Sequence, residues 1–79
     1  MQAITPRQRE ILLFITQHKE KNGYAPSFSE IMESLGISSR GHVHRFLVGL
    51  EKKGFIHRPA MLSSARAARA IQILQPVPA

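Results

Sequence analysis

The sequence predicts a single, mainly α-helical domain that ends in a small β-hairpin. Three segments between residues 5 and 54 carry apolar residues at helical spacing, and each is bounded by residues that begin or end helices. After Gly54 the helical spacing ends, and Ile71 and Ile73 share one face of a short segment, which is typical of a strand. The chain has 79 residues, enough for one hydrophobic core, so we expect residues 1–75 to form the domain and residues 76–79 to be a tail or the start of a linker.

The first predicted helix begins at Thr5 and Pro6, because Thr is a favoured N-cap and Pro is favoured at the first helical position. Gln8 stands three residues after Thr5 and completes a capping box. Asn22-Gly23 ends this helix, and the residues expected on its inward face are Ile11, Leu12, Phe14 and Ile15.

A second capping box, formed by Ser27 and Glu30, begins a short helix that reaches about Leu35. Its inward residues are predicted to be Phe28, Ile31, Met32 and Leu35. Gly36 then permits a tight turn, Ile37 can enter the core, and Ser38 or Ser39 can cap the next helix.

The third helix is predicted from about Arg40 to Lys53, with Gly54 as its stop and Val43, Phe46, Leu47 and Leu50 facing inward. Beyond it, residues 55–58 and 70–74 read as the two strands of a hairpin. The basic, small-residue-rich segment 59–69 suits a wing between them, although a fourth helix over about 63–70 is an alternative because alanine favours helices. The resulting architecture is a three-helix winged helix-turn-helix.

The positive charge lies in the second half of the chain. The sequence carries 11 Lys and Arg against 5 Asp and Glu, a net charge of +6. Residues 1–39 hold four of each sign, whereas residues 40–79 hold seven basic residues and one acid, Glu51. A basic surface on a neutral scaffold is typical of a protein that binds a polyanion such as nucleic acid.

The outer face of the third predicted helix suits base reading. At about 100° per residue, the residues that share this face are Gly41, His44, Arg45 and Val48, and none is acidic. Arginine can donate to both O6 and N7 of guanine. The hydroxyls of Ser27 and Ser29, with the first N–H groups of the second helix, suit a backbone phosphate. A basic helix by itself is more often only a solvated face, but its combination with a helix-turn-helix and a basic hairpin favours DNA.

The sequence lacks the residues that metal binding, catalysis and membrane insertion require. There is no cysteine, and His42 and His44 lie about 200° apart on a helix, so we expect no metal site. Without a Gly-x-Ser-x-Gly motif, a Gly-rich phosphate loop or paired carboxylates, we expect neither an enzyme nor a cofactor. No apolar run reaches the length of a membrane span, which favours a cytoplasmic protein.

The sequence contains spaced motifs that cover most of its length: Thr5-x-Arg7-Gln8-x-x-Ile11, Gly23-Tyr24-x-Pro26-Ser27-x-x-Glu30-Ile31, Leu35-Gly36, Leu47-x-x-Leu50-Glu51-x-Lys53-Gly54-x-Ile56 and Arg69-Ala70-Ile71-x-Ile73-Leu74. Together they resemble the N-terminal DNA-binding domain of the LexA repressor family, which controls the bacterial DNA-damage (SOS) response.

The resemblance implies a sequence-specific repressor that places helix 40–53 in the major groove and wing 59–69 over the adjacent groove of double-stranded DNA. The base-reading positions it implies are Ser39, Gly41, His42, His44 and Arg45. The residues expected to contact the DNA backbone are Ser27, Ser29, Arg40, Lys52, Lys53, Arg66 and Arg69.

The base-reading positions also depart from the family. The best-known LexA proteins carry Asn, Ala, Glu and Glu at positions 41, 42, 44 and 45, whereas another branch matches Ser39 and the pair Val43-His44. We therefore expect a different operator. Histidine and arginine in place of two acids should favour purine edges and raise non-specific binding.

LexA proteins normally continue into a dimerising domain that cuts an Ala-Gly bond with a Ser-Lys dyad. This sequence has no Ala-Gly dipeptide, so we expect no self-cleavage and weak or no dimerisation by itself, with dimers forming on DNA or through a missing C-terminal domain. An excised domain and a free-standing relative both remain open, and we expect association with the bacterial nucleoid. The alternative function is a winged-helix interaction module that docks an acidic protein partner.

Overall fold

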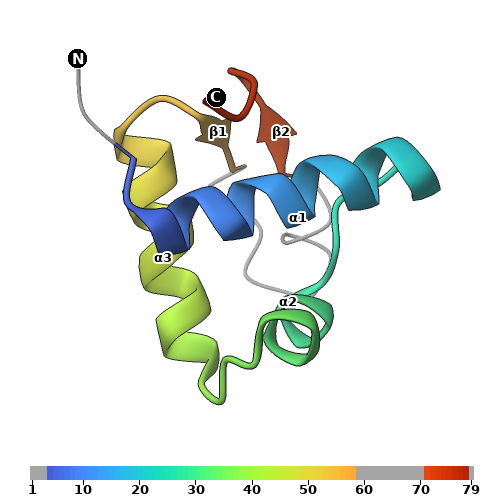
Figure 1. Cartoon of the computed structure of the whole chain (residues 1–79), viewed down its shortest axis with the longest axis vertical. Coiled ribbons are helices and arrows are strands. Elements are labelled where there is room, and N and C mark those ends of the chain that lie inside the picture. Colours follow the sequence, from blue (N-terminus) through green and yellow to red (C-terminus); the bar gives the residue numbers. More distant parts are fainter. Residues whose placement is uncertain (1–3, 59–70, 79) are drawn as a thin grey trace.

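The computed structural model describes residues 4–58 and 71–78. In these ranges three helices precede two short strands, in the order α1 (Pro6–Asn22), α2 (Phe28–Leu35), α3 (Arg40–Lys52), β1 (Ile56–His57) and β2 (Gln72–Ile73). Helix α2 lies beside the N-terminal end of α3, and the strands lie near its C-terminal end (Figure 1). The predicted mainly α fold with a hairpin is confirmed. The predicted wing with Arg66 and Arg69, and the alternative helix over 63–70, lie outside the described residues.

Both predicted capping boxes are present. The Thr5 hydroxyl accepts from the Gln8 N–H at 3.1 Å, and the Gln8 side chain accepts from the Thr5 N–H at 3.1 Å. At α2, Ser27 and Glu30 form the same reciprocal pair at 3.1 and 2.8 Å. These bonds satisfy N–H groups that have no partner within the helix, which is why the two helices begin where the sequence predicts.

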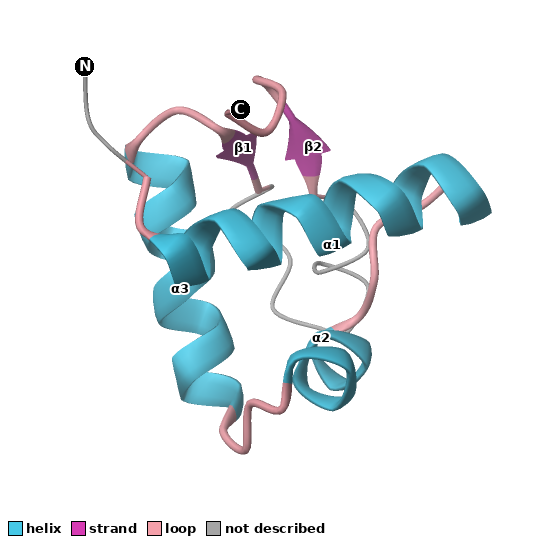
Figure 2. Ribbon diagram, in the orientation of Figure 1, coloured by secondary structure: helices cyan, strands magenta, loops and turns pink. Residues whose placement is uncertain are grey.

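A tight turn joins α2 to α3 as predicted. Gly36 adopts the left-handed conformation with φ of +66°, and Ile37, which is only 8% exposed, packs into the core. The Ser39 hydroxyl then accepts from the Gly41 N–H at 3.2 Å and caps α3. Turn and caps together fix the angle between α2 and α3, so the helix-turn-helix is present (Figure 2).

The C-terminal end of α3 and the hairpin differ slightly from expectation. Helix α3 ends at Lys52, one residue before the predicted limit. The strands pair antiparallel with Ile56 opposite Ile73, but each has two residues, fewer than predicted. The ladder stops because the N–H groups of Leu74 and Gln75 both donate to Phe55 O, at 2.8 and 3.3 Å, which breaks the alternation of an antiparallel pair.

One hydrophobic core lies between the helices and the hairpin. Its larger fully buried side chains come from every element or its edge: Ile11, Leu12, Ile15, Ile31, Val43, Leu47, Leu50, Ile56 and Ile71. Phe46, predicted to face inward, is partly buried against this core. Burial of aliphatic area is the main source of stability in so small a domain.

The C-terminal residues also contact the domain. Lys19 Nζ donates to Ile71 O at 3.0 Å, and Arg9 Nε donates to Pro78 O at 3.0 Å. Val77 packs against the core. Residues 76–78, predicted as a tail or linker, therefore lie along α1.

Candidate nucleic-acid interface

The N-terminal half of α3 exposes the predicted base-reading residues. All of these except Ser39, which is half-buried, are exposed: Gly41, His42, His44 and Arg45. Val43, in the middle of this set, is fully buried and attaches the helix to the core. Because His44 and Arg45 follow Val43 by one and two residues, the helical rotation turns them outward. The structure thus brings these side chains onto the solvent side of one helix.

The first turn of α2 has the form of an anion site. Ser27 is half-buried and accepts the Glu30 N–H at 3.1 Å, so its hydroxyl hydrogen is still able to donate. Ser29 is exposed in the same turn. The helix macrodipole adds partial positive charge here, which favours a bound anion, although the Glu30 carboxylate stands in the same turn and accepts from the Ser27 N–H at 2.8 Å.

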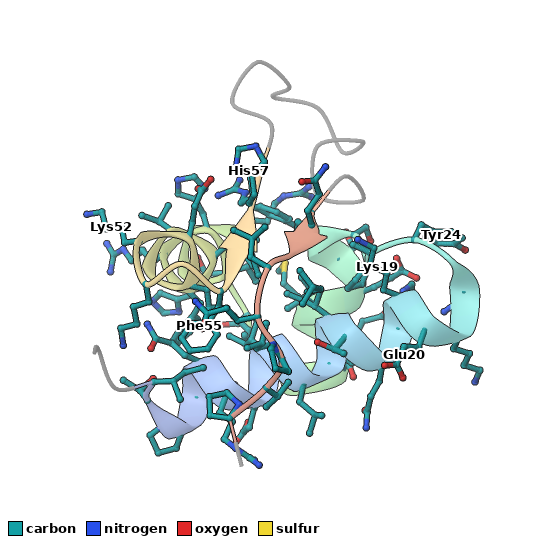
Figure 3. The ribbon with its side chains drawn as sticks, turned by 90° about the horizontal axis from the view of Figure 1, so that it is seen from above. Lys19, Glu20, Tyr24, Lys52, Phe55 and His57 are labelled. Carbon is teal, nitrogen blue, oxygen red and sulfur yellow. The ribbon has the colours of Figure 1, made fainter. Side chains whose placement is uncertain are left out.

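The two lysines at the end of α3 have different surroundings. Lys52 is exposed and extends from the outer side of the helix (Figure 3). Lys53 is half-buried, and its Nζ donates to Gln8 Oε1 at 2.7 Å. Lys53 therefore ties α3 to α1, a role that its place in the sequence motif did not reveal. Of the pair, Lys52 is the simpler probe of a contact with DNA.

The one acid of α3 is turned toward the hairpin. Glu51 Oε2 accepts from the Arg58 backbone N–H at 3.1 Å and lies 3.8 Å from His57 Nδ1. Its charge is therefore near β1, whereas the exposed face with His44 and Arg45 carries no acid. That face keeps the positive potential that attracts polyanions.

Arg58, which the sequence did not single out, lies beside the first residue of α2. Its guanidinium carbon lies 5.8 Å from the centre of the Phe28 ring, and the guanidinium carbon of Arg40 lies 5.8 Å from the same ring. The cue in the sequence was its place at the end of a strand just before the wing, but its contact with Phe28 follows only from the tertiary fold.

We find neither a metal-binding cluster nor a membrane-spanning helix in the described part of the chain. No group of three or more His, Cys, Asp or Glu side chains within 4–58 and 71–78 could hold a metal ion. None of the helices in these ranges has the length and hydropathy to cross a membrane. Arg66 and Arg69, predicted to contact the DNA backbone from the wing, fall outside the described residues.

Comparison with known proteins identifies related sequences. The family model described as the LexA DNA binding domain matches residues 1–70. The chain is 41% identical over 76 residues to the LexA repressor of Koribacter versatilis (strain Ellin345), a match that covers 96% of this chain and 34% of the relative. It is 40% identical over 72 residues to the LexA repressor of Erythrobacter litoralis (strain HTCC2594), with 91% and 29% covered. The chain thus spans about a third or less of the length of these relatives.

Proposed function

This chain belongs to the LexA DNA-binding domain family, and on that premise we propose that it is the sequence-reading part of a transcriptional repressor. It binds double-stranded DNA at an operator and represses by occupying a promoter. The observation that carries this proposal is the exposed, acid-free face of α3, presented by a capped helix-turn-helix. That this repressor acts in the DNA-damage response is a prediction from the family resemblance.

In the proposed complex α3 enters the major groove with its N-terminal half toward the bases. Arg45 donates to guanine, and the imidazoles of His42 and His44 bond base edges or phosphates. The exposed position of these side chains supports this assignment. Histidine and arginine at positions 44 and 45 favour purine edges, so we expect an operator unlike that of family members with acids there.

Contacts with phosphates orient α3. In the proposed complex Ser27 and Ser29 at the N-terminus of α2 and the exposed Lys52 bind phosphates, and the wing predicted over 59–69 lies over the adjacent groove. Such contacts do not depend on base sequence and supply affinity for DNA in general.

The leading test is selection of the domain against a randomised duplex library at several salt concentrations. If about four phosphates are neutralised, log K should fall with log salt at a slope near roughly −3.6. We expect one sequence family to be enriched at every salt concentration. Enrichment of none at any salt would refute the sequence-reading role.

A pair of variants tests the division of labour on the selected duplex. Arg45→Ala should relax preference at one base position and cost about 1 to 3 kcal/mol of binding free energy. Lys52→Ala, the matched loss of one exposed cation on the same helix, should weaken all duplexes about equally. Lys52 is chosen over Lys53 because Lys53 also bonds Gln8. Identical profiles across the library would contradict the assignment of Arg45 to base reading.

The Arg45→Ala variant also tests the alternative function, in which the domain docks an acidic protein partner. If α3 docks a protein, a selected acidic partner should displace every duplex and should itself lose affinity in Arg45→Ala. If DNA is the ligand, the selected duplex should compete with such partners at low concentrations. Competition titrations monitored by fluorescence anisotropy distinguish the two outcomes.

A further inference from the structure

Two arginines from separate elements share one aromatic ring. Arg40 begins α3, Arg58 follows β1, and both guanidinium carbons lie 5.8 Å from the centre of the ring of Phe28, which begins α2. The N-terminal ends of both helices of the helix-turn-helix and the base of the wing therefore meet at Phe28. We call Arg40 and Arg58 the arginine pair.

The described residues provide no acid for the arginine pair. Among them Arg7 forms an ion pair with Glu10, while Glu30 lies 3.4 Å from His18 Nε2 and Glu51 lies 3.8 Å from His57 Nδ1. Arg58 Nε is buried and has no hydrogen-bond acceptor in the described part of the chain. Leaving a buried donor of a charged group unsatisfied lowers the stability of the folded state. The position of Arg58 is thus not explained by its hydrogen bonds within the domain.

Packing on Phe28 by itself accounts poorly for both arginines. A cation beside an aromatic ring is attracted by the ring, but this contact does not supply the hydrogen-bond acceptor that Arg58 Nε lacks. Here, however, two like charges are held near one ring, while the acid in the first turn of α2, Glu30, is engaged in the capping box with Ser27. All of these features favour an anion from outside the chain.

The position of Arg58 is also fixed through its backbone. Glu51 accepts from the Arg58 N–H at 3.1 Å and so connects the end of β1 to the C-terminal part of α3. The carboxylate bonds the backbone of Arg58, not its guanidinium, so the charge of the side chain is left for another partner. Arg58 is oriented by Glu51 at its backbone and by Phe28 at its side chain.

We propose that Arg58 and Arg40 together bind the phosphodiester backbone of DNA beside the N-terminus of α2, with Phe28 and Glu51 as positioning residues. This inference rests on the proposed function and deepens it, because it adds a contact from the base of the wing. Guanidinium groups suit this role, since their planar N–H donors can bind two phosphate oxygens at once. A contact at this point would fix α2, α3 and the start of the wing relative to one strand.

The test compares Arg58→Gln, Arg58→Lys and the unaltered domain on one duplex across salt concentrations. Losing one phosphate contact should make the slope of log K against log salt less steep by about 0.9. The affinity ratio between the unaltered domain and Arg58→Gln should then narrow by about 3.5-fold from 50 to 200 mM salt. Arg58→Lys keeps the charge and should keep the slope, although it loses the planar fork. Thermal unfolding confirms that each variant is folded.

Neutral methylphosphonate substitutions, placed one at a time along the duplex, locate the contact. The unaltered domain should lose affinity at one or two phosphates to which Arg58→Gln is indifferent. Equal slopes for all three proteins, or the same phosphate profile for Arg58→Gln and the unaltered domain, would overturn the proposal. Because a phosphate contact forms on any duplex, this result does not depend on the library selection. The proposed phosphate contact of the arginine pair can be refuted while the sequence-reading role is supported, and the sequence-reading role can be refuted while the phosphate contact is supported.

Discussion

Gly49 occupies the place on α3 that approaches Gln8 of α1. A Cβ built on Gly49 would lie 2.6 Å from Gln8 Nε2, so the Gln8 amide would have to move. Gln8 Oε1 accepts from the Thr5 N–H at 3.1 Å and from Lys53 Nζ at 2.7 Å. The missing side chain at position 49 therefore protects a group that caps α1 and holds the end of α3.

We expect Gly49→Ala to have different effects in two backgrounds. Alanine is favoured over glycine in a helix by about 1 kcal/mol, so the substitution should stabilise a Gln8→Ala protein by about 0.5 to 1 kcal/mol. With Gln8 present, loss of its hydrogen bonds, about 0.5 to 1.5 kcal/mol each, should cancel or reverse that gain. Urea unfolding of the four proteins measures the coupling. An equal effect of Gly49→Ala in both backgrounds would show that Gln8 is not displaced.

At the scale of the element, the capping box of α2 combines stability with a predicted contact to DNA. Ser27→Ala removes the acceptor for the Glu30 N–H and should lower the free energy of unfolding by about 1 kcal/mol. Ser29→Ala, an exposed substitution in the same turn, should change it by less than about 0.5 kcal/mol. Both variants should weaken DNA binding if both hydroxyls bind phosphate. Chemical denaturation measures the effect on stability, and DNA titration measures the effect on binding. If Ser29→Ala binds DNA as tightly as the unaltered domain, Ser29 does not contact the phosphate.

The elements also show which features a sequence can predict. Helix limits were predicted to within a residue because the cap side chains of Thr5, Ser27 and Ser39 bond backbone groups two or three residues away. The strand limits were overextended because they depend on a distant segment bonding Phe55 O. For the same reason, the contact of Arg58 with Phe28 and that of Lys53 with Gln8 were missed. Local hydrogen bonding can be predicted from the sequence, whereas these long-range contacts need the fold.

Across the whole molecule, three of the five acids hold caps or junctions of the scaffold, whereas the start of α3 exposes Arg40 and Arg45. Glu10 pairs with Arg7 at 2.8 Å, and Glu30 completes the α2 cap and lies 3.4 Å from His18. Glu51 bonds the backbone of β1. With these carboxylates held at caps and element junctions, the exposed half of α3 keeps its positive charge. In the described residues the positive charge of the second half of the sequence is thus exposed at the start of α3, as expected for the proposed binding of a polyanion.

A domain that reads one half-site should bind far more tightly when two copies are joined. In a tandem protein with a flexible linker, binding of the second copy to a duplex with two half-sites becomes intramolecular. We expect a gain of about 10² to 10⁴ in affinity over the single domain, measured by fluorescence anisotropy at fixed salt. A duplex with one half-site scrambled is the control, because the second copy then contributes only non-specific contacts and most of the gain should disappear. If the tandem protein and the single domain bound the two-site duplex equally, each copy would not be reading its own half-site, and the placement of α3 in one major groove per domain would be wrong.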